Sequence, residues 1–395
     1  MTDAIEPGMV RAFTVHIEDS QIEDLKLRLR EARIPQQIAG AKWTMGTEQM
    51  HLEKTAKRWA EDYDWRKWEK IINKHNHFKC LIDDIDVHFI HARSNRPDAV
   101  PILCQHGWPG SFLEFYKCID LLANPGNPAD PAFHVVVPSL PGFGFSSAPR
   151  KKGFQVPQTA TILDKLMTIL KYPKYFVQGG DWGAPTVRTM AALFPHRVAG
   201  LHLNMIHGKP DTGVLASLKN LAVQAAPSLF LSAERRKEIA LDALWSERET
   251  GYYKIQETKP QTVSYGLSDS PVGLLAWINE KMRAGPDLDI DEVLTNVSIY
   301  WFTNSIASSV RIYKEAPSIR DIFISSYVSV PTGAAIFPDE IVHTLEEDAR
   351  RNHNLVHWSI MAKGGHFAAF TQPVALVNDI RVFVRKVRKL REYRL

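Results

Sequence analysis

Four short apolar runs, each followed by a turn and a helical segment, constrain the fold of this chain more than any other feature. Their hydrophobicity is nearly continuous rather than alternating, which is typical of parallel strands buried on both faces. Strand, turn and helix repeated in this order predict a doubly wound α/β sheet. The four runs are Pro101–Gly107, Phe133–Leu140, Lys174–Asp181 and Ala199–Met205.

The alternating pattern stops after the fourth run and returns only near the C-terminus, in the strand-like runs VPTGAAIF and VHWSIMAKGG. A helical insertion between two parts of a parallel sheet predicts a lid over the edge where ligands of such folds bind. We therefore predict an N-terminal segment over residues 1–95, a core in two parts over residues 96–206 and 322–395, and a mostly helical lid over residues 207–321.

The N-terminal segment has its own pattern. Apolar residues at helical spacing predict a helix that ends near Pro35, and Trp59, Trp65 and Trp68 mark a second helical stretch. Alternating apolar and polar residues over Cys80–Ser94 predict a hairpin of two strands. This segment therefore adds a meander to the sheet.

Composition excludes several classes of protein. The formal net charge of +4 among 395 residues gives no strong attraction to nucleic acid. Three cysteines are too few for a disulfide framework and fit a reducing compartment. The sequence contains neither a signal peptide nor an apolar stretch of the roughly 18 residues that a membrane span needs. We expect a cytoplasmic protein without a transmembrane segment, and a homodimer is an option that the sequence leaves open.

The C-terminal run RVFVRKVRKLREYRL is rich in basic residues. Phe383, Val387 and Leu390 recur there at helical spacing, which predicts a final amphipathic helix with a solvated basic face. Peripheral contact of this basic face with anionic lipid is the alternative.

Four histidines are close together in the sequence, without acids or thiols at ligand spacing. We interpret them as part of a polar hairpin, and we expect neither a metal nor a cofactor. They are His75, His77, His88 and His91.

The third apolar run ends in Gly179–Gly183, with the sequence GGDWG. Hydrolases often have serine as the nucleophile in the middle of the frame Gly-x-Ser-x-Gly, whereas here the middle residue is Asp181. An aspartate before a helix can simply be an N-cap. The flanking glycines, however, allow the tight strand-to-helix turn that exposes one side chain in a site, and the helix N-terminus favours a carboxylate there.

Backbone donors for an oxyanion hole are predicted on two loops. The loop Gln105–Ser111 follows the first core run, and hydrolases of this fold take one N–H from that loop and one from the residue after the nucleophile. The donors here would be the amides of Trp108 and Trp182, because Pro109 has no N–H. The simpler alternative for this loop is a Gly/Pro connection without a role.

His366 follows the last strand-like run and precedes the final helix, where the chain order nucleophile, acid, histidine would place a catalytic base. A carboxylate must orient the imidazole, and both Asp339 and Glu340 end the preceding run. The sequence alone does not indicate which of these two carboxylates orients the imidazole.

An aspartate nucleophile indicates substrates that react at saturated carbon, namely epoxides or alkyl halides, because its ester can be cleaved by water whereas a serine ether cannot. The carboxylate is already ionised at neutral pH, so His366 would activate the water of the second step. An epoxide oxygen leaves as a basic alkoxide and needs an acid, for which tyrosine is suited. The predicted lid contains Tyr252, Tyr253, Tyr265, Tyr300 and Tyr313.

Ordered motifs cover nearly the whole chain: Phe13–Pro35, Tyr63–Ser94, His106–Ser111, Leu140–Ser146, Gly179–Gly183, Gly251–Pro260, Ser268–Ile278, Ser308–Glu315, Phe337–Glu340 and Gly364–Phe370. Together they resemble the epoxide hydrolases of the microsomal type, which have an α/β-hydrolase fold. The chain starts without the membrane anchor of the mammalian members, so it is similar to the soluble fungal members in that respect.

The resemblance implies a role for each candidate residue. It implies that Asp181 is the nucleophile, that His366 is the base and that Glu340, the last residue of the FPx(D/E) motif, is the acid partner of the histidine. It also implies that Tyr252 and Tyr313 donate to the epoxide oxygen, with the adjacent Tyr253 as the alternative to Tyr252.

The reaction implied by the resemblance is hydrolysis of an epoxide to a vicinal diol through a covalent aspartyl ester. One alternative is haloalkane dehalogenation with the same Asp–His–acid machinery, for which the indole groups of Trp108 and Trp182 could hold the halide. The other is a binding protein of this fold without catalysis. The paired tyrosines argue against the first alternative, and the complete set of site residues argues against the second.

Overall fold

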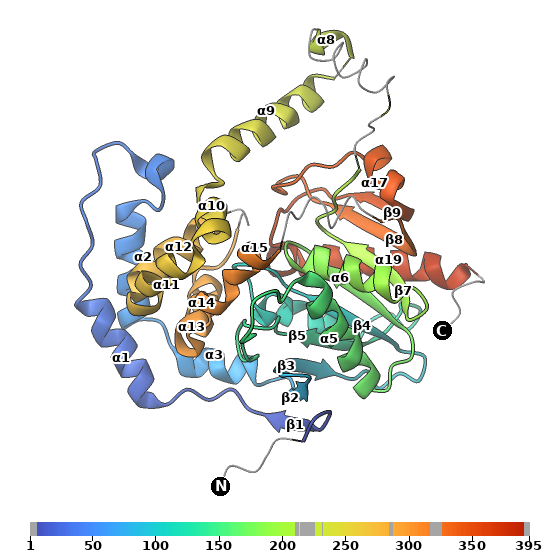
Figure 1. Cartoon of the computed structure of the whole chain (residues 1–395), viewed down its shortest axis with the longest axis horizontal. Coiled ribbons are helices and arrows are strands. Elements are labelled where there is room, and N and C mark those ends of the chain that lie inside the picture. Colours follow the sequence, from blue (N-terminus) through green and yellow to red (C-terminus); the bar gives the residue numbers. More distant parts are fainter. Residues whose placement is uncertain are drawn as a thin grey trace.

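The computed structural model describes residues 6–209, 213, 226–230, 232–283, 287–316 and 326–390. Within these ranges a single sheet runs through the molecule (Figure 1). Its strands are β1 (Val10–Phe13), β2 (His77–Ile82), β3 (Ile85–Ala92), β4 (Val100–Gln105), β5 (Phe133–Pro138), β6 (Tyr175–Gly179), β7 (Val198–Leu203), β8 (Val328–Ile336) and β9 (His353–Ile360).

The strand order in space is β1-β2-β3-β5-β4-β6-β7-β8-β9. Strands β4 to β9 pair in parallel, whereas β1, β2 and β3 pair antiparallel to each other and β3 pairs antiparallel to β5. The chain moves from β4 to β5 in one direction and then returns past β4 to β6, so the order reverses between β4 and β6. Ligands of open α/β sheets bind outside the carboxyl ends of the strands at such a reversal. The prediction of a doubly wound, mostly parallel sheet is confirmed.

Helices cover both faces of the sheet, as a sheet of buried parallel strands requires. The helices around the sheet are α4 (Tyr116–Ala123), α5 (Val156–Ile169), α6 (Gly183–Leu193), α17 (Glu346–Asn352), α18 (Ala368–Thr371) and α19 (Pro373–Lys389), with the short 3-10 helix η2 (Phe112–Phe115) before α4. Helices α5 and α6 pack on one face, and α4 and α19 pack on the other (Figure 1). Two clusters of buried side chains, one on each face, form the core.

Further helices lie between β7 and β8 in the sequence: α8 (Pro227–Phe230), α9 (Ala233–Arg248), α10 (Gly251–Thr258), α11 (Pro260–Asp269), α12 (Pro271–Met282), α13 (Ile290–Thr303), α14 (Ile306–Ser309) and α15 (Arg311–Glu315). Among them, α9 extends away from the rest of the molecule (Figure 1). The predicted boundary between residues 321 and 322 lies outside the described residues.

The N-terminal helices α1 (Asp19–Arg30), α2 (Gln49–Glu61) and α3 (Trp65–Ile72), with the 3-10 helix η1 (Lys42–Met45), lie between β1 and β2 in the sequence. Helices α1 and α2 pack against α12 (Figure 1). The indole N–H of Trp59 donates to Ser298 Oγ of α13 at 3.0 Å, and Arg58 forms a two-pronged ion pair with Asp291. The N-terminal segment therefore braces the helices that lie between β7 and β8.

The tryptophan-rich stretch forms two helices, where the sequence predicted one. Helix α2 ends at Glu61, and the side chain of Asp64 accepts a hydrogen bond from the Lys67 amide at the start of α3. This N-cap gives the backbone a local alternative to a continuous helix.

The hairpin of β2 and β3 is confirmed, with His77 opposite Ile90. The interpretation of the four histidines as part of a polar hairpin is wrong for two of them, which lie in the interior. His77 and His88 are buried, stack on each other and hydrogen-bond at 2.8 Å between Nδ1 and Nε2. Burial lowers the pKa of His77 to about 4, so this pair is a neutral part of the interior.

The predicted C-terminal helix is confirmed as α19, with Phe383 and Val387 fully buried, whereas Leu390 lies just beyond its end. Basic side chains of α19 bind groups of the same molecule: Arg385 pairs with Asp130 at 2.6 Å, and Lys386 contacts His357 Nδ1 at 2.9 Å. These two basic side chains therefore have partners within the molecule. Residues 391–395 lie outside the described part of the chain.

Candidate active site

Asp181 lies on a sharp turn between β6 and α6, at the point where the strand order reverses. Its φ of 46° is in the left-handed region, which residues other than glycine rarely adopt. The neighbouring glycines make this turn sterically possible: a Cβ at Gly179 would lie 2.7 Å from the Gly183 carbonyl carbon, and one at Gly183 would lie 2.1 Å from Gln105 O. The turn thus holds the carboxylate at the edge of the sheet, which a simple N-cap would not require.

Both carboxylate oxygens of Asp181 have partners. The backbone amide of Trp108 donates to Oδ1 at 2.6 Å, and His366 Nε2 lies 3.0 Å from Oδ2. The amide of Trp182 lies near the same carboxylate, since both groups pack against Gly107. A Cβ added to Gly107 would lie 2.1 Å from Asp181 Oδ1 and 2.6 Å from Trp182 N. The two predicted backbone donors therefore flank the same carboxyl group.

The loop that carries Trp108 is held by α13. Asn296 Nδ2 donates to Pro109 O at 2.7 Å, and the Tyr300 hydroxyl donates to Gly110 O at 2.8 Å. Both side chains are buried, so these hydrogen bonds are shielded from water. Tyr300, one of the lid tyrosines considered from the sequence, is thus engaged with backbone, and Tyr265 is 69% exposed.

His366 lies between two carboxylates. Its Nδ1 donates to Glu340 Oε1 at 2.6 Å, and Nε2 is directed at Asp181. Glu340 is buried, whereas the adjacent Asp339 is exposed and its amide binds Gly364 O. The fold therefore places Glu340, and not Asp339, against the imidazole.

The charge of this pair of carboxylates controls the protonation of His366. Burial disfavours the imidazolium, but Glu340 and Asp181 outweigh burial and hold the pKa of His366 well above its ordinary 6.5. With both carboxylates ionised, the imidazole is therefore protonated at neutral pH.

Two of the predicted tyrosines meet above this group, on helices α10 and α15, which pack together. The Tyr252 ring stacks on Trp108 at 5.5 Å between centroids, and the Tyr313 ring lies edge-on to Trp182 at 4.9 Å. The two tyrosine rings lie edge to face, with 5.9 Å between their centroids, and burial together with the nearby Asp181 raises the pKa of each well above 10. Both hydroxyls are therefore neutral donors at physiological pH.

A cavity of about 490 Å³ is lined by Asp181, His366 and Tyr252, and by neither Tyr253 nor Tyr313. The Tyr313 ring contacts Trp108 and Tyr252, which do line the cavity. Its remaining lining residues are Trp108, Pro109, Trp245, Glu249, Glu280, Lys281, Arg283, Asp339, Ile341 and Phe367. Lys281 Nζ lies 4.6 Å from the centre of the Tyr252 ring and 2.6 Å from Glu280. The charged lining residues at the ends of α9 and α12 were not predicted, because nothing in their local sequence separates them from a solvated helix surface.

Glu114 is a second residue that sequence reasoning missed. It lies in η2, is only 7% exposed, and is close enough to His366, Asp181 and Glu340 for their charges to act on it. Burial raises the pKa of Glu114 to about 8, and the negative charges of Asp181 and Glu340 add to this effect. The only signal in the sequence was an acidic residue in an otherwise apolar stretch, Phe112–Phe115.

The sequence predicted no transmembrane segment, and the helices of the structure test this prediction. Within the described ranges, none is both long enough and apolar enough to span a bilayer.

The chain is similar to known proteins along almost its whole length. Residues 10–115 match the family described as Epoxide hydrolase N terminus, and residues 100–239 match the alpha/beta hydrolase fold. Epoxide hydrolase 1 of Sus scrofa is 39% identical over 415 residues, which cover 96% of this chain and 90% of the relative.

Two solved structures agree with this result. The juvenile hormone epoxide hydrolase of Bombyx mori has a TM-score of 0.89 at 31% identity and covers 97% of this chain and 95% of its own. The epoxide hydrolase of Aspergillus niger has a TM-score of 0.84 at 32% identity and covers 97% of both chains. The predicted fold and family are confirmed: the chain belongs to the epoxide hydrolase family and has the α/β-hydrolase fold.

Proposed function

We propose that this enzyme hydrolyses epoxides to vicinal diols through a covalent ester on Asp181. The observation that carries the proposal is the position of one carboxylate. Its two oxygens contact a backbone amide and the His366 imidazole, and it lines a cavity beneath Tyr252. A small-molecule epoxide is the substrate class.

In the first step, an oxygen of Asp181 attacks one ring carbon of the epoxide, and the bond from that carbon to the ring oxygen breaks. The oxygen takes a proton from Tyr252 or Tyr313. Two adjacent buried tyrosines suit this role, because each is a neutral proton donor at physiological pH. The stacking of Tyr252 on Trp108 fixes the ring over the nucleophile.

Ester formation then changes the state of His366. It removes the negative charge of Asp181, one of the two charges that keep the imidazole protonated. The pKa of His366 therefore falls, its extra proton can return to the tyrosinate, and the neutral imidazole becomes a base. Glu340 remains on Nδ1 and keeps Nε2 directed at the ester.

In the second step, His366 takes a proton from water, and the resulting hydroxide attacks the ester carbonyl of Asp181. The amides of Trp108 and Trp182 stabilise the oxyanion of the tetrahedral intermediate. The bond between the acyl carbon and the alcohol oxygen then breaks, and the departing alkoxide takes the proton of the new carboxylic acid. Asp181 is again a carboxylate and His366 is again protonated.

We also propose that each of the four predicted segments either supplies catalytic side chains or supports the segment that does. Residues 96–206 and 322–395 supply the nucleophile, the base and its partner, residues 207–321 supply the tyrosines, and residues 1–95 brace that lid. The hydrogen bond from Trp59 to Ser298 and the one between the hydroxyls of Tyr63 and Thr295 support this last role. Haloalkane dehalogenation and a non-catalytic role are not favoured, since the similar proteins above are epoxide hydrolases.

The decisive experiment is a single turnover in H₂¹⁸O with enzyme in excess over a simple aryl epoxide such as styrene oxide. We expect the diol to contain unlabelled oxygen from the enzyme, and we expect ¹⁸O in the Asp181 peptide by mass spectrometry. The matched control is Asp339→Asn, an exposed carboxylate at the rim of the same cavity, which should behave as the wild type. Label that enters the diol directly would show that water attacks the epoxide and that Asp181 is not the nucleophile.

A further inference from the structure

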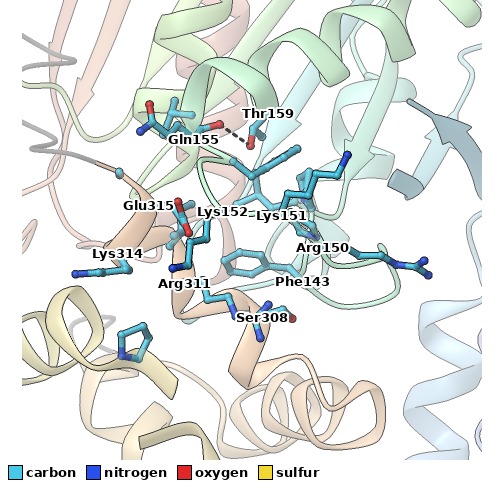
Figure 2. Close-up of a pocket in the computed structure, with 18 of the residues that line it drawn as sticks. Phe143, Arg150, Lys151, Lys152, Gln155, Thr159, Ser308, Arg311, Lys314 and Glu315 are labelled. Carbon is cyan, nitrogen blue, oxygen red and sulfur yellow. Dashed lines mark hydrogen bonds between the residues drawn. The ribbon is translucent and has the colours of Figure 1, made fainter. Parts of the chain in front are cut away.

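A second cavity of about 310 Å³ lies between the core and the lid, and it shares no lining residue with the active-site cavity. The segment Pro149–Val156 forms one wall, and α14 and α15 form the other. In Figure 2, Arg150 and Lys151 lie on one side of the Phe143 ring, and Lys152, Glu315 and Lys314 lie on the other. Nothing in the proposed reaction uses this cavity.

Positive charge is concentrated around this cavity. Its lining has five cationic side chains and a single carboxylate, Glu315, whereas the whole chain has 48 basic and 44 acidic residues. Among the described residues, none of the five cationic side chains has an ion-pair partner, and all five residues are exposed. They are Arg150, Lys151, Lys152, Arg311 and Lys314.

The single carboxylate already has a partner. The amide of Gly153 donates to Glu315 Oε2 at 2.7 Å, and this hydrogen bond ties the basic loop to α15. Gly153 has a φ of 84°, which glycine adopts without strain, so the loop can turn its amide toward the helix. The contact holds basic residues of two distant parts of the sequence around one cavity.

The inner part of the cavity is apolar. Leu140, Phe143 and Val156 line it and are almost completely buried, and Ile312 of α15 completes this surface. An apolar interior beneath a cationic rim matches a molecule with an apolar chain and an anionic end. The volume is at the lower end of the range for ligand sites, about 300–1,000 Å³, which fits one short chain rather than a patch of bilayer.

We propose that this cavity binds a free amphiphilic anion, a carboxylate with a medium-length apolar chain. The chain lies against Phe143 and Ile312, and the carboxylate lies among the basic side chains of the rim. This site is separate from the catalytic one and takes a ligand that need not contain an epoxide.

The position of α15 links the two cavities. Four residues of α15 line the anion site: Arg311, Ile312, Lys314 and Glu315. Between them, Tyr313 is buried and its ring contacts Trp108 and Tyr252, which line the active-site cavity. A ligand that contacts this five-residue helix will shift the position of Tyr313, and hence kcat, without competing with substrate. This second part rests on the proposed function, whereas the binding itself does not.

The first experiment measures binding without turnover. Isothermal titration of the full chain with octanoate, methyl octanoate and acetate separates the contributions of charge and chain. We expect octanoate to bind at least about tenfold more tightly than the other two, and to weaken between about 0.05 M and about 0.5 M NaCl, because salt screens exposed charges. Equal affinity for the methyl ester, or binding only to phosphatidylserine vesicles and not to octanoate, would overturn the proposal.

A triple variant locates the site. Arg150→Gln, Lys152→Gln and Arg311→Gln together should weaken octanoate binding by about tenfold, since each exposed charge contributes a modest share. The control is Lys67→Gln with Lys70→Gln, two exposed lysines on α3. If the triple variant binds octanoate as the wild type does, the site lies elsewhere. The thermal unfolding of each variant shows whether it is folded.

Kinetics test the link to Tyr313. Saturating octanoate should change kcat in the wild type with little change in KM, and the triple variant should lose this response at the same octanoate concentration. Octanoate that competes with the epoxide would place the ligand in the active site and overturn the assignment. A chain that binds octanoate but turns over no epoxide would refute the proposed function and leave the binding site standing.

Discussion

Replacing Glu114 by glutamine tests whether a neutral carboxylic acid is buried beside the catalytic group. Burial raises the pKa of Glu114 from its ordinary 4.5 to about 8. Below about pH 8 the folded enzyme therefore keeps this side chain protonated, whereas an unfolded chain ionises it above about pH 4.5. Glutamine has nearly the shape of the protonated acid and cannot ionise, so Glu114→Gln removes the titration with little change in packing.

The pH dependence follows from proton binding. Between pH 4.5 and about 8 the folded state binds a proton that the unfolded state has lost, so the free energy of unfolding falls as the pH rises through this window. Each pH unit in this window lowers the free energy of unfolding by about 1.4 kcal/mol, so the total loss above pH 8 approaches about 5 kcal/mol. Between about pH 5.5 and about pH 8.5 the loss is about 3 kcal/mol.

Urea unfolding followed by the fluorescence of the ten tryptophans provides the assay. We expect the free energy of unfolding of Glu114→Gln, taken relative to the wild type, to be about 3 kcal/mol higher at about pH 8.5 than at about pH 5.5. Glu31→Gln, an exposed residue just after α1, is the control and should follow the wild type at both values. Parallel curves for wild type and Glu114→Gln would show that Glu114 is ionised in the folded enzyme, and the reasoning from burial would be refuted.

Three further predictions concern the site and its support. Tyr252→Phe should lower kcat for epoxide opening by roughly 10- to 100-fold, because one general acid, Tyr313, remains. Tyr253→Phe should have little effect, because the Tyr253 ring packs on the two tyrosines, whereas Tyr313 contacts the indoles of Trp108 and Trp182; stopped-flow measurement of ester formation distinguishes the two variants. Glu340→Gln should lower turnover by roughly 10³-fold or more through loss of the imidazole orientation, while the diol yield of Asp339→Asn should match the wild type. Asp379→Asn should cost about 3–5 kcal/mol of stability in urea unfolding at neutral pH. Burial alone would raise the pKa of Asp379, but hydrogen bonds from two buried histidines lower this pKa well below 3.8. The stability that Asp379 contributes should therefore be lost as the pH falls below 3.8. An unfolding midpoint for Asp379→Asn equal to that of the wild type would contradict this prediction.

Much of the fold could be predicted, because it depends on local patterns. The apolar runs that became β4 to β7 are buried along nearly their whole length, and this gives continuous hydrophobicity in the sequence. The break between α2 and α3 could not be predicted from the tryptophans, because the cap at Asp64 competes with a helical pattern that continues on both sides. The burial of His77 and His88 also escaped prediction, because two neutral imidazoles satisfy each other inside the protein.

The candidate site was likewise predicted only in part. Asp181, Trp108 and His366 were found because each lies in the loop after a core strand, and the carboxyl ends of parallel strands meet at one edge of the sheet. Glu114, Lys281 and the basic cavity were not found, because their meaning depends on neighbours that are distant in the sequence.

By itself, the sequence determined the kind of chemistry: a carboxylate on a glycine-rich turn, a histidine after the last strand and a lid with tyrosines, all read from local turn and strand patterns. The tertiary structure decided which of two adjacent residues faces the site, with Glu340 rather than Asp339 on the imidazole and Tyr252 rather than Tyr253 in the cavity. Adjacent residues share the same local sequence, so only packing against distant parts of the chain can distinguish them. Burial, and the protonation that follows from it, is likewise a property of the assembled fold.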